Sequence, residues 1–404
     1  MTAATSDVAI LIPPLVRPDT PHVEGLRPRR SQLSKAAPEG RLLPTPRWHS
    51  GMMPQRPPGD LAIDLGTANT VVFARGRGIV MLEPSVIAID EGSGKVLAVG
   101  AEAKRMIGRT PGRIRALRPL RHGVLTDFDV TEQMLAHFMR RAIDRRFTRP
   151  QVMLCVPSGL TALERDAVEE AARAAGARAV YLIEEPLAAA IGADLPIAEP
   201  VASMVLDIGG GTTEIAVISL GSMVVWRSVR IGGYEMDDAL VSHMKREHGL
   251  EIGEGRAEQL KIEIGSAAEV ADEETEVNGR DLRSGGLRTA TVNAREVHEA
   301  LTQTVGQIID AVRDTLEETP PELSADISEH GIVLAGGGVL LRDFPQRLRA
   351  ETGLPVQLVA EPLTCVAVGA GRCLDELGAI AWAAKPPKRR RHPGSRRLRS
   401  SWRL

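Results

Sequence analysis

Aromatic side chains are scarce in this sequence, at 3% of 404 residues, whereas 43% of the residues are hydrophobic. The core must therefore be built mainly from Ala, Val, Leu and Ile. A chain of this length with this apolar share can bury a large core and has room for more than one domain. The shortage of rings restricts what fills the core and does not exclude a globular fold.

Cysteines and long apolar runs are also few in this sequence. The three cysteines, Cys155, Cys365 and Cys373, show no metal-ligand spacing, and the first two stand in apolar runs. We therefore expect buried thiols in a reducing cytosol and no thiolate metal centre. No apolar stretch of the sequence reaches the length of a membrane-spanning helix.

Acidic residues are absent from residues 385–404, which carry nine Lys and Arg. The tail therefore carries a charge of +9, and residues 1–59 carry +4. Because the net charge of the whole chain is −2, residues 60–384 carry −15. The first segment also holds 11 of the 27 prolines and no sustained periodicity, which predicts a disordered Pro-rich extension. Met52-Met53 stands just before the organised sequence, so translation starting there would omit most of that extension. The tail 385–404 is predicted to be basic and disordered.

One glycine-rich stretch organises the chain, Val205-Leu-Asp-Ile-Gly-Gly-Gly-Thr-Thr-Glu-Ile-Ala-Val-Ile218. It predicts an apolar strand that ends near Asp207, a tight turn and a second strand. Glycines let backbone N–H groups approach a bound group, and several N–H groups in one concavity form an anion site. A glycine hairpin turn without a ligand fits this stretch about equally well, because such turns need positive φ.

A second copy of the pattern favours the anion site. Leu61-Ala-Ile-Asp-Leu-Gly-Thr-Ala-Asn-Thr-Val-Val-Phe73 repeats the plan, with Asp64 standing 143 residues before Asp207. A third glycine turn ends the run Gly331-Ile-Val-Leu-Ala-Gly-Gly-Gly-Val339. Three such turns, two with an aspartate at the strand end, predict a nucleotide held between two facing domains, with its metal near two carboxylates.

Strand and helix patterns alternate between these turns, which is typical of α/β layering. Apolar residues at helical spacing predict helices over residues 130–147, 237–247, 255–264, 294–318 and 364–377. The last of these has small residues that permit close packing on a neighbour. Residues 113–121 are predicted to be a basic connector, and residues 269–277 and 286–292 to be strands around an exposed turn.

These turns and four further motifs resemble the actin-like ATPase superfamily and, within it, the MreB/Mbl family of bacterial actins. The further motifs are Glu83-Pro-Ser-Val86, Ile183-Glu-Glu-Pro-Leu-Ala-Ala-Ala-Ile-Gly192, Lys261-Ile-Glu-Ile-Gly265 and Thr319-Pro-Pro-Glu-Leu323. The similarity runs from about Asp60 to about Leu377. It implies an α/β, actin-like (ribonuclease H-like) fold of two facing domains, each with a small subdomain, and a nucleotide in the central cleft.

The resemblance also implies domain boundaries. Residues 60–200 would form domain I, with the first phosphate loop and a small subdomain insert. Residues 201–384 would form domain II, with the second phosphate loop and the adenosine motif. The closing helix 364–377 is expected to pack back on domain I.

The two hairpins supply the phosphate and metal part of the predicted site. ATP carries negative phosphates that need donors and a divalent cation, so ATP and Mg²⁺ are the expected cofactors. Asp64 and Asp207 are predicted to hold Mg²⁺ through water, because the duplicated aspartate is poorly explained as a cap of a single turn. The two phosphate loops are predicted to consist of Gly66, Thr67, Ala68 and Asn69, and of Gly209, Gly210 and Gly211.

The catalytic and adenosine parts of the site rest on the resemblance. It implies that Glu185 orients and deprotonates an in-line water with help from Thr212, whereas Glu185 alone would be interpreted as stabilising a helix N-terminus. It implies that Glu258 and Lys261 lie at the ribose and adenine, whereas their spacing alone fits an ordinary surface ion pair. The other side of the nucleoside would be lined by Gly336, Gly337, Gly338 and Val339.

The implied function is that of an ATP-dependent, membrane-associated actin-like filament protein. It would organise peptidoglycan synthesis and so determine cell shape or wall thickening. ATP would favour the polymer, and hydrolysis would destabilise it. The implied partners are copies of the chain itself, membrane-bound cell-wall elongation proteins and anionic lipid. The expected location is the cytoplasm at the inner face of the cytoplasmic membrane, and no nucleic acid is expected.

Two other classes of actin-fold ATPase share such a nucleotide site. A DnaK-type chaperone would need a substrate-binding domain after the ATPase, where only a basic tail follows. A sugar or acetate kinase would need a substrate pocket and a catalytic acid near the first hairpin, where the inserts are short. A scaffold that binds ATP but barely hydrolyses it is a third alternative, and the presence of Glu185 and Thr212 argues against it.

The basic tail generates a first prediction. Residues 60–384, at −15, would be repelled by an anionic membrane, whereas each Lys or Arg of the tail contributes about 1 kcal/mol near such a surface. Arg145-Arg-Phe147 stands where the family carries an apolar membrane-contact loop but has one large apolar residue, so little insertion is expected there.

Deleting residues 385–404 should therefore weaken co-sedimentation with anionic vesicles in a salt-sensitive way, leaving ATP turnover and polymerisation in solution nearly unchanged. Deleting residues 1–52 is the control and should change little. Equal vesicle binding of the tail deletion and the full chain at low salt would disprove the role of the tail, because a solvated tail without lipid contact predicts that equality.

Overall fold

The computed structural model describes residues 59–143, 149–268 and 272–383, with residues 375–383 described by their backbone alone. The predictions for the Pro-rich extension before Gly59, for the loop Arg145–Phe147 and for the tail 385–404 lie outside the described residues.

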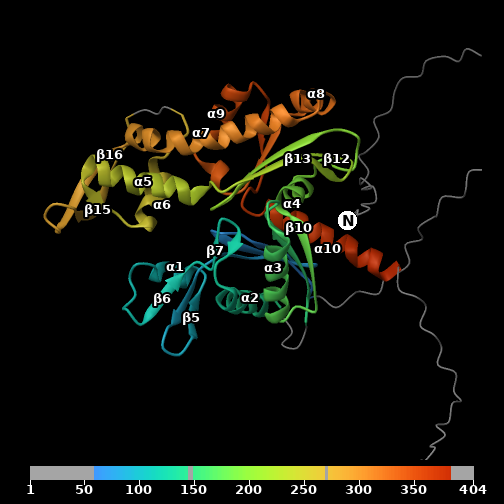
Figure 1. The fold of residues 1–404 in the computed structure, drawn as a ribbon, viewed down its shortest axis with the longest axis horizontal. Helices are drawn as coiled ribbons and strands as arrows, with labels where there is room; N and C mark the ends of the chain where they lie inside the picture. The colour runs from blue at the N-terminus through green and yellow to red at the C-terminus, as the bar shows by residue number, and fades with distance from the viewer. Residues whose placement is uncertain (1–58, 144–148, 269–271, 384–404) are drawn as a thin grey trace, which may run out of the picture. The chain divides into compact units, whose positions relative to one another are not determined.

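Two five-stranded sheets form the framework (Figure 1). The first has the order β10-β9-β1-β2-β3. Its strands are β1 (Leu61–Leu65), β2 (Asn69–Ala74), β3 (Gly78–Pro84), β9 (Gln151–Val156) and β10 (Ala179–Glu184). The second has the order β13-β12-β11-β17-β18. Its strands are β11 (Ser203–Ile208), β12 (Thr213–Ser219), β13 (Ser222–Val229), β17 (Ile332–Ala335) and β18 (Val356–Leu358).

The two sheets repeat one topology. In each, three strands form an antiparallel meander, and the first strand of the meander then pairs in parallel with a later strand. The sequence duplication of the aspartate–glycine hairpin thus corresponds to a duplicated sheet. Every residue of the central strand β11 is buried, as expected for a strand that is covered on both faces. Exposed and partly buried residues alternate along most of the edge strand β13.

Helices cover the outer face of each sheet. On the first sheet, α2 (Phe128–Ala142) and α3 (Ala162–Ala174) share an apolar core with β1 and β9. On the second sheet, α5 (Gly233–His248), α6 (Glu254–Ile264) and α7 (Ala294–Glu318) share a core with β11 and β12. Aliphatic side chains make up most of both cores, as the scarcity of rings predicts. The long amphipathic helix predicted over 294–318 is confirmed as α7.

Two helices lie between the sheets. α4 (Glu185–Gly192) contacts β9 and β10 of the first sheet and β11 and β12 of the second, and α10 (Cys365–Ala383) contacts α4, β1 and β9. A Cβ atom on Gly369 would collide with the carbonyl oxygen of Ala188, so the two helix backbones touch. The close packing predicted from the small residues of this last helix is confirmed. Cys155 on β9 and Cys365 at the start of α10 are buried, as expected.

Two small sheets complete the described fold. β4 (Ile87–Asp90), β5 (Lys95–Val99) and β6 (Ile114–Leu117) form one sheet with α1 (Ala101–Met106) packed on it. β14 (Leu250–Glu251), β15 (Glu274–Asp281) and β16 (Leu287–Asn293) form the other. The two-stranded ladder of β7 (Leu120–Arg121) and β8 (Val124–Leu125) precedes α2. The prediction of a basic connector over 113–121 is wrong, because the apolar residues that alternate along it lie in two strands, β6 and β7.

Several helices and strands begin or end at residues other than those predicted, because capping side chains and pairing partners determine where an element ends. α2 begins at Phe128, after Asp127 accepts a hydrogen bond from the amide of Val130, and ends at Ala142, short of the predicted residue 147. α5 begins a turn early, where the Glu235 carboxylate accepts a bond from the amide of Gly232. β15 begins later than predicted, and α10 runs past Leu377. The helix α8 (Pro321–His330) was not predicted.

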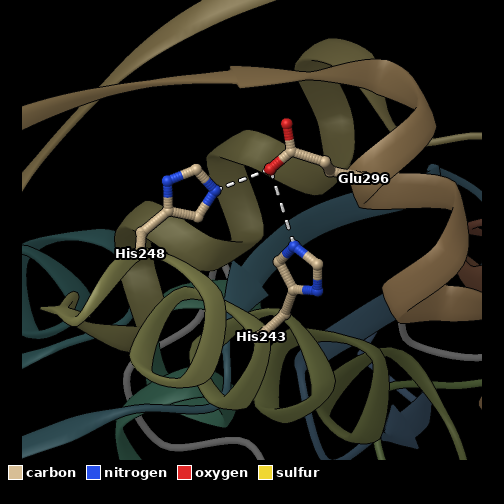
Figure 2. Close-up of side chains that lie close together, drawn as sticks. All are labelled: His243, His248 and Glu296. Atoms are coloured by element: carbon tan, nitrogen blue, oxygen red, sulfur yellow. Dashed lines mark hydrogen bonds and ion pairs between the residues drawn. The ribbon is translucent and has the colours of Figure 1, made fainter.

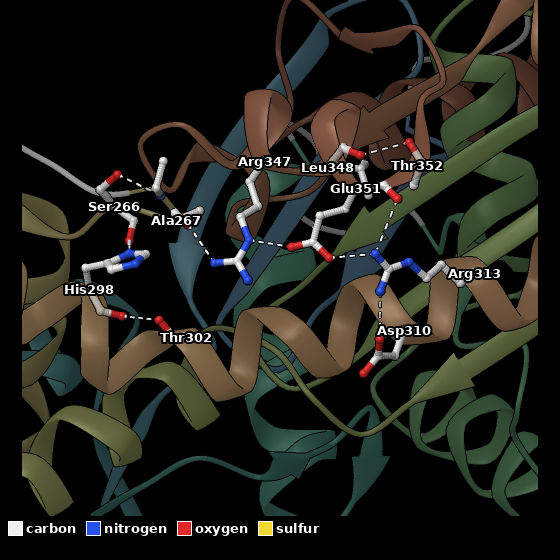
Figure 3. A network of polar contacts seen from close by, with 11 residues as sticks. Ser266, Ala267, His298, Thr302, Asp310, Arg313, Arg347, Leu348, Glu351 and Thr352 are labelled. Carbon is white, nitrogen blue, oxygen red and sulfur yellow. Dashed lines mark hydrogen bonds and ion pairs between the residues drawn. The ribbon is translucent and has the colours of Figure 1, made fainter.

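Polar contacts tie α7 to α9 (Phe344–Thr352) (Figure 3). The Arg347 guanidinium bonds the Glu351 carboxylate at 2.6 Å and the Ala267 carbonyl at 3.0 Å. Arg313 on α7 reaches the same carboxylate at 2.8 Å. These contacts hold α9 against α7 and against the segment that follows α6.

The contact between α4 and α10 yields a stability prediction. Gly369→Ala should destabilise the protein by about 1–3 kcal/mol, because a backbone carbonyl occupies the space of the new methyl group. Gly306→Ala is the matched control. It lies inside α7 with no atom near the position of a Cβ, so it should stabilise the protein by about 0.5–1 kcal/mol. Urea unfolding followed by circular dichroism measures both, and equal stability of the two variants would contradict the packing.

Candidate functional site

A cavity of about 660 Å³ is lined by residues from both sheets and from the helices beside them. All predicted site residues except Gly211 and Val339 line it. They come from the β1–β2 and β11–β12 turns, from the first turn of α4, from α6 and from the turn after β17. Residues separated by more than 250 positions therefore converge on one space.

The two hairpin turns touch each other at the cavity. A Cβ atom on Gly210 would lie 2.5 Å from the Cβ of Ala68 and 3.0 Å from its amide nitrogen. A Cβ atom on Gly211 would lie 3.0 Å from the side chain of Thr67, so Gly211 faces the first turn and not the cavity. The Thr67 hydroxyl in turn accepts a bond from the amide of Gly123 at 3.0 Å. Glycine is needed here because two backbones approach closely.

Five acidic residues line the same cavity, among them Asp64, Asp207 and Glu185. Asp64 stands on β1 and Asp207 on β11, and burial raises their pKa values to about 7 and about 8. Burial, and then the charge of Asp64, also raises the pKa of Glu185 in the first turn of α4. Desolvated carboxylates that repel one another are stabilised by a cation, and their oxygen atoms suit a hard divalent ion. The pair Asp64 and Asp207 thus fits the predicted Mg²⁺.

The glycines of the third turn make room for the second aspartate. Gly336 has a φ of 83°, and a Cβ atom there would collide with a carboxylate oxygen of Asp207. A Cβ atom on Gly338 would meet the side chain of Ile208. Gly337 and Gly338 line the cavity, whereas Val339, in the short helical turn η1 (Gly338–Leu340), is buried in the core of the second sheet.

The predicted adenosine residues have partners other than each other. The Lys261 ammonium lies 2.8 Å from the Asp237 carboxylate and donates to the carbonyl of Gly233 at 2.9 Å. Glu258 pairs instead with Lys104 of α1, at 2.7 Å. The alternative of an ordinary surface pair between Glu258 and Lys261 is therefore wrong. Burial raises the pKa of Asp237 to about 6, although the positive charge of Lys261 opposes the shift.

Sequence reasoning missed the residues of α5 at the cavity. Gly233, Tyr234, Met236 and Asp237 line it, and the Tyr234 ring packs 4.7 Å below the Arg118 guanidinium. A weak signal existed, because Gly232-Gly233 follows a strand as the other glycine turns do. The pairing of Asp237 with Lys261 spans 24 positions and leaves no local pattern in the sequence.

Comparison with known proteins identifies the family of this chain. The model of the MreB/Mbl protein family matches residues 58–381. The chain belongs to the MreB/Mbl protein family. The family predicted from the sequence is confirmed, and it replaces the alternatives of a DnaK-type chaperone and of a sugar or acetate kinase.

Curated members of the MreB/Mbl family resemble this chain over nearly their whole length. "Cell shape-determining protein MreB" of Escherichia coli strain K12 is 54% identical over 324 residues, which are 78% of this chain and 93% of that protein. "Cell shape-determining protein Mbl" of Bacillus subtilis strain 168 is 48% identical over 323 residues, which are 80% of this chain and 97% of that protein.

Solved structures of bacterial actins share the fold. MreB5 of Spiroplasma citri bound to AMPPNP is 34% identical, with a TM-score of 0.78, and the match covers 82% of this chain and all of that one. A MamK double helical filament is 24% identical, with a TM-score of 0.67, and the match covers 78% of this chain and 99% of that one. The predicted α/β, actin-like fold is confirmed. None of the helices in the described part of the chain combines the length and apolar character needed to cross a membrane.

The contact between the two hairpin turns can be tested by a double-mutant cycle. Gly210→Ala should destabilise the protein by about 1–3 kcal/mol, because the new methyl group overlaps Ala68. Adding Ala68→Gly removes the methyl group that it strikes, so the two changes should couple by at least about 0.5 kcal/mol in thermal unfolding. Gly112→Ala, with no atom near its Cβ position, is the control. Additive effects of the pair would mean that the turns do not touch.

Proposed function

We propose that this chain binds ATP with Mg²⁺ in the cavity between its two glycine hairpins, hydrolyses it, and assembles into actin-like filaments that determine cell shape. The observation that carries the proposal is the convergence of both hairpin turns with Asp64, Asp207 and Glu185 on one cavity, where desolvation raises the pKa values of all three carboxyl groups. The printed names of the relatives support it, since they are cell shape-determining proteins, and MreB5 was crystallised with ADP and with AMPPNP.

Each part of the cavity would bind one part of the nucleotide. The residues 66–69 and the glycines 209 and 210 would donate N–H groups to the phosphates, and Asp64 and Asp207 would hold the metal. Mg²⁺, when bound, supplies positive charge beside the phosphates. Glu258, Lys261 and the Gly336–Gly338 turn would enclose the nucleoside. Gly211 and Val339 would support this site by packing and not by contact.

Hydrolysis would rest on Glu185 and Thr212. The water oxygen would form a bond to the γ-phosphorus as the bond to the departing ADP oxygen breaks, and the Glu185 carboxylate would accept a proton of that water. A raised pKa makes the carboxylate a better acceptor. Thr212, buried beside the second turn, would help to orient the water.

The filament and its surroundings belong to the same proposal. The MamK double helical filament shares the fold, which supports self-association of this chain. We propose residues 60–200 and 201–384 as domains I and II, with α10 packed back on domain I. The resemblance and the basic tail support a location at the inner face of the cytoplasmic membrane, with lipid and membrane-bound cell-wall elongation proteins as partners.

Two substitutions separate binding from hydrolysis. Glu185→Gln keeps the volume of the side chain and should retain nucleotide affinity while lowering phosphate release about a hundredfold or more, leaving filaments that persist. Asp207→Ala should instead abolish Mg²⁺-dependent ATP binding without unfolding, which a fluorescent nucleotide and circular dichroism measure together.

The outcomes distinguish the alternatives. Unchanged turnover in Glu185→Gln would leave Glu185 as a residue that only stabilises the N-terminus of α4. No turnover in the unaltered, polymerising chain would favour a nucleotide-dependent scaffold. Unchanged affinity in folded Asp207→Ala would show that the cavity is not the phosphate site.

A further inference from the structure

Two histidines and a glutamate converge away from the cavity (Figure 2). His243 and His248 come from the last turns of α5, and Glu296 comes from the first turn of α7. One carboxylate oxygen, Oε2 of Glu296, lies 2.6 Å from Nε2 of His248 and 3.7 Å from Nε2 of His243. The potential ligand atoms all lie within 4.8 Å of one another.

The Nε2 atom of His243 is the unusual member of this cluster. The residue is 5% exposed, and the atom is buried without a hydrogen-bond partner among the described residues. Its nearest carboxylate oxygen, at 3.7 Å, is beyond hydrogen-bond distance. Buried polar atoms in folded proteins are nearly always satisfied, so an unpaired nitrogen aimed at two possible metal ligands calls for a further group.

The helices hold the carboxylate in this orientation. The Asn293 side chain caps α7 by accepting a bond from the amide of Glu296 at 3.0 Å, and its amide group donates to Oε1 of Glu296 at 2.5 Å. Oε1 is thereby occupied, and Oε2 is left to face both imidazoles. A partner that fixes the non-ligating side of a ligand is a common feature of metal sites.

The distances from Oε2 of Glu296 to the two imidazole nitrogens suit a small transition-metal ion. Ligand bonds of about 2.0–2.2 Å in tetrahedral geometry separate neighbouring ligands by about 3.3 Å. The two distances to Oε2, 2.6 and 3.7 Å, lie on either side of that value, so small side-chain rotations would satisfy both. Imidazole nitrogens with one carboxylate favour Zn²⁺ and its neighbours over Mg²⁺ or Ca²⁺.

We propose that His243, His248 and Glu296 bind a divalent transition-metal ion of the Zn²⁺ class, which joins the C-terminal end of α5 to the N-terminal end of α7. The ion replaces the His248–Glu296 hydrogen bond and gives Nε2 of His243 a partner. One further coordination position is left for water. The opposite end of α5 carries Gly233, Tyr234 and Asp237 at the cavity, so this site is separate from the carboxylates proposed for Mg²⁺.

The test uses the full chain without a polyhistidine tag and without nucleotide, in excess Mg²⁺ so that the cavity carboxylates are not available. Titration with Zn²⁺ against a chromophoric chelator should reveal one site, and Zn²⁺ should raise the thermal midpoint. Co²⁺ should give the visible absorption of a tetrahedral nitrogen–oxygen site. His248→Ala and Glu296→Gln should each weaken Zn²⁺ binding at least about tenfold.

His330→Ala is the matched control, since His330 lies on α8 outside the cluster. It should bind Zn²⁺ as the unaltered chain does. An equal loss of affinity in the control and in His248→Ala would overturn the proposal, because it would indicate general surface binding. If a cluster variant fails to fold, the unaltered chain still tests the proposal. An unaltered chain that neither binds Zn²⁺ nor shows the Co²⁺ absorption would overturn it and leave only an ion-pair cluster.

Discussion

The contact between the backbones of α4 and α10 is the constraint on which the arrangement of the two sheets depends. Gly369 and Gly192 are the points of closest approach, and at each of them a Cβ atom would strike the backbone of the other helix. Because α4 contacts strands of both sheets, its position fixes one sheet relative to the other. Glu185 is the first residue of α4, so the same packing sets where its carboxyl group lies in the cavity.

Burial of acidic groups is the cost of this arrangement. Asp64, Asp207 and Glu185 stand where burial destabilises their charged forms, which is why their pKa values are raised. The proposed cation would offset this cost. Preorganised charge of this kind favours ligand binding at the expense of the unliganded fold.

The sequence was most informative where a motif is local and least where partners are distant. The hairpins at Asp64 and Asp207 were predictable because strand, aspartate and glycine turn are consecutive, and the structure has both in the predicted form. Lys104 could not be foreseen as the partner of Glu258, because 154 residues separate them. The interpretation of residues 113–121 as a connector failed because their few apolar residues become meaningful only when β4 is present to pair with them.

The two sheets repeat one topology, but the turns after two equivalent strands differ, and this difference explains why one nucleoside pocket is proposed and not two. The strands β9 and β17 occupy equivalent places, with Cys155 beside Asp64 and Ala335 beside Asp207. The turn after β9 is filled, because the amide of Ser158 donates to the buried Glu214 carboxylate at 3.1 Å. The turn after β17 is made of glycines and borders the cavity. The two sheets thus share the hairpin turn, and the difference between the turns after β9 and β17 would leave space for the proposed base and sugar beside the second sheet alone.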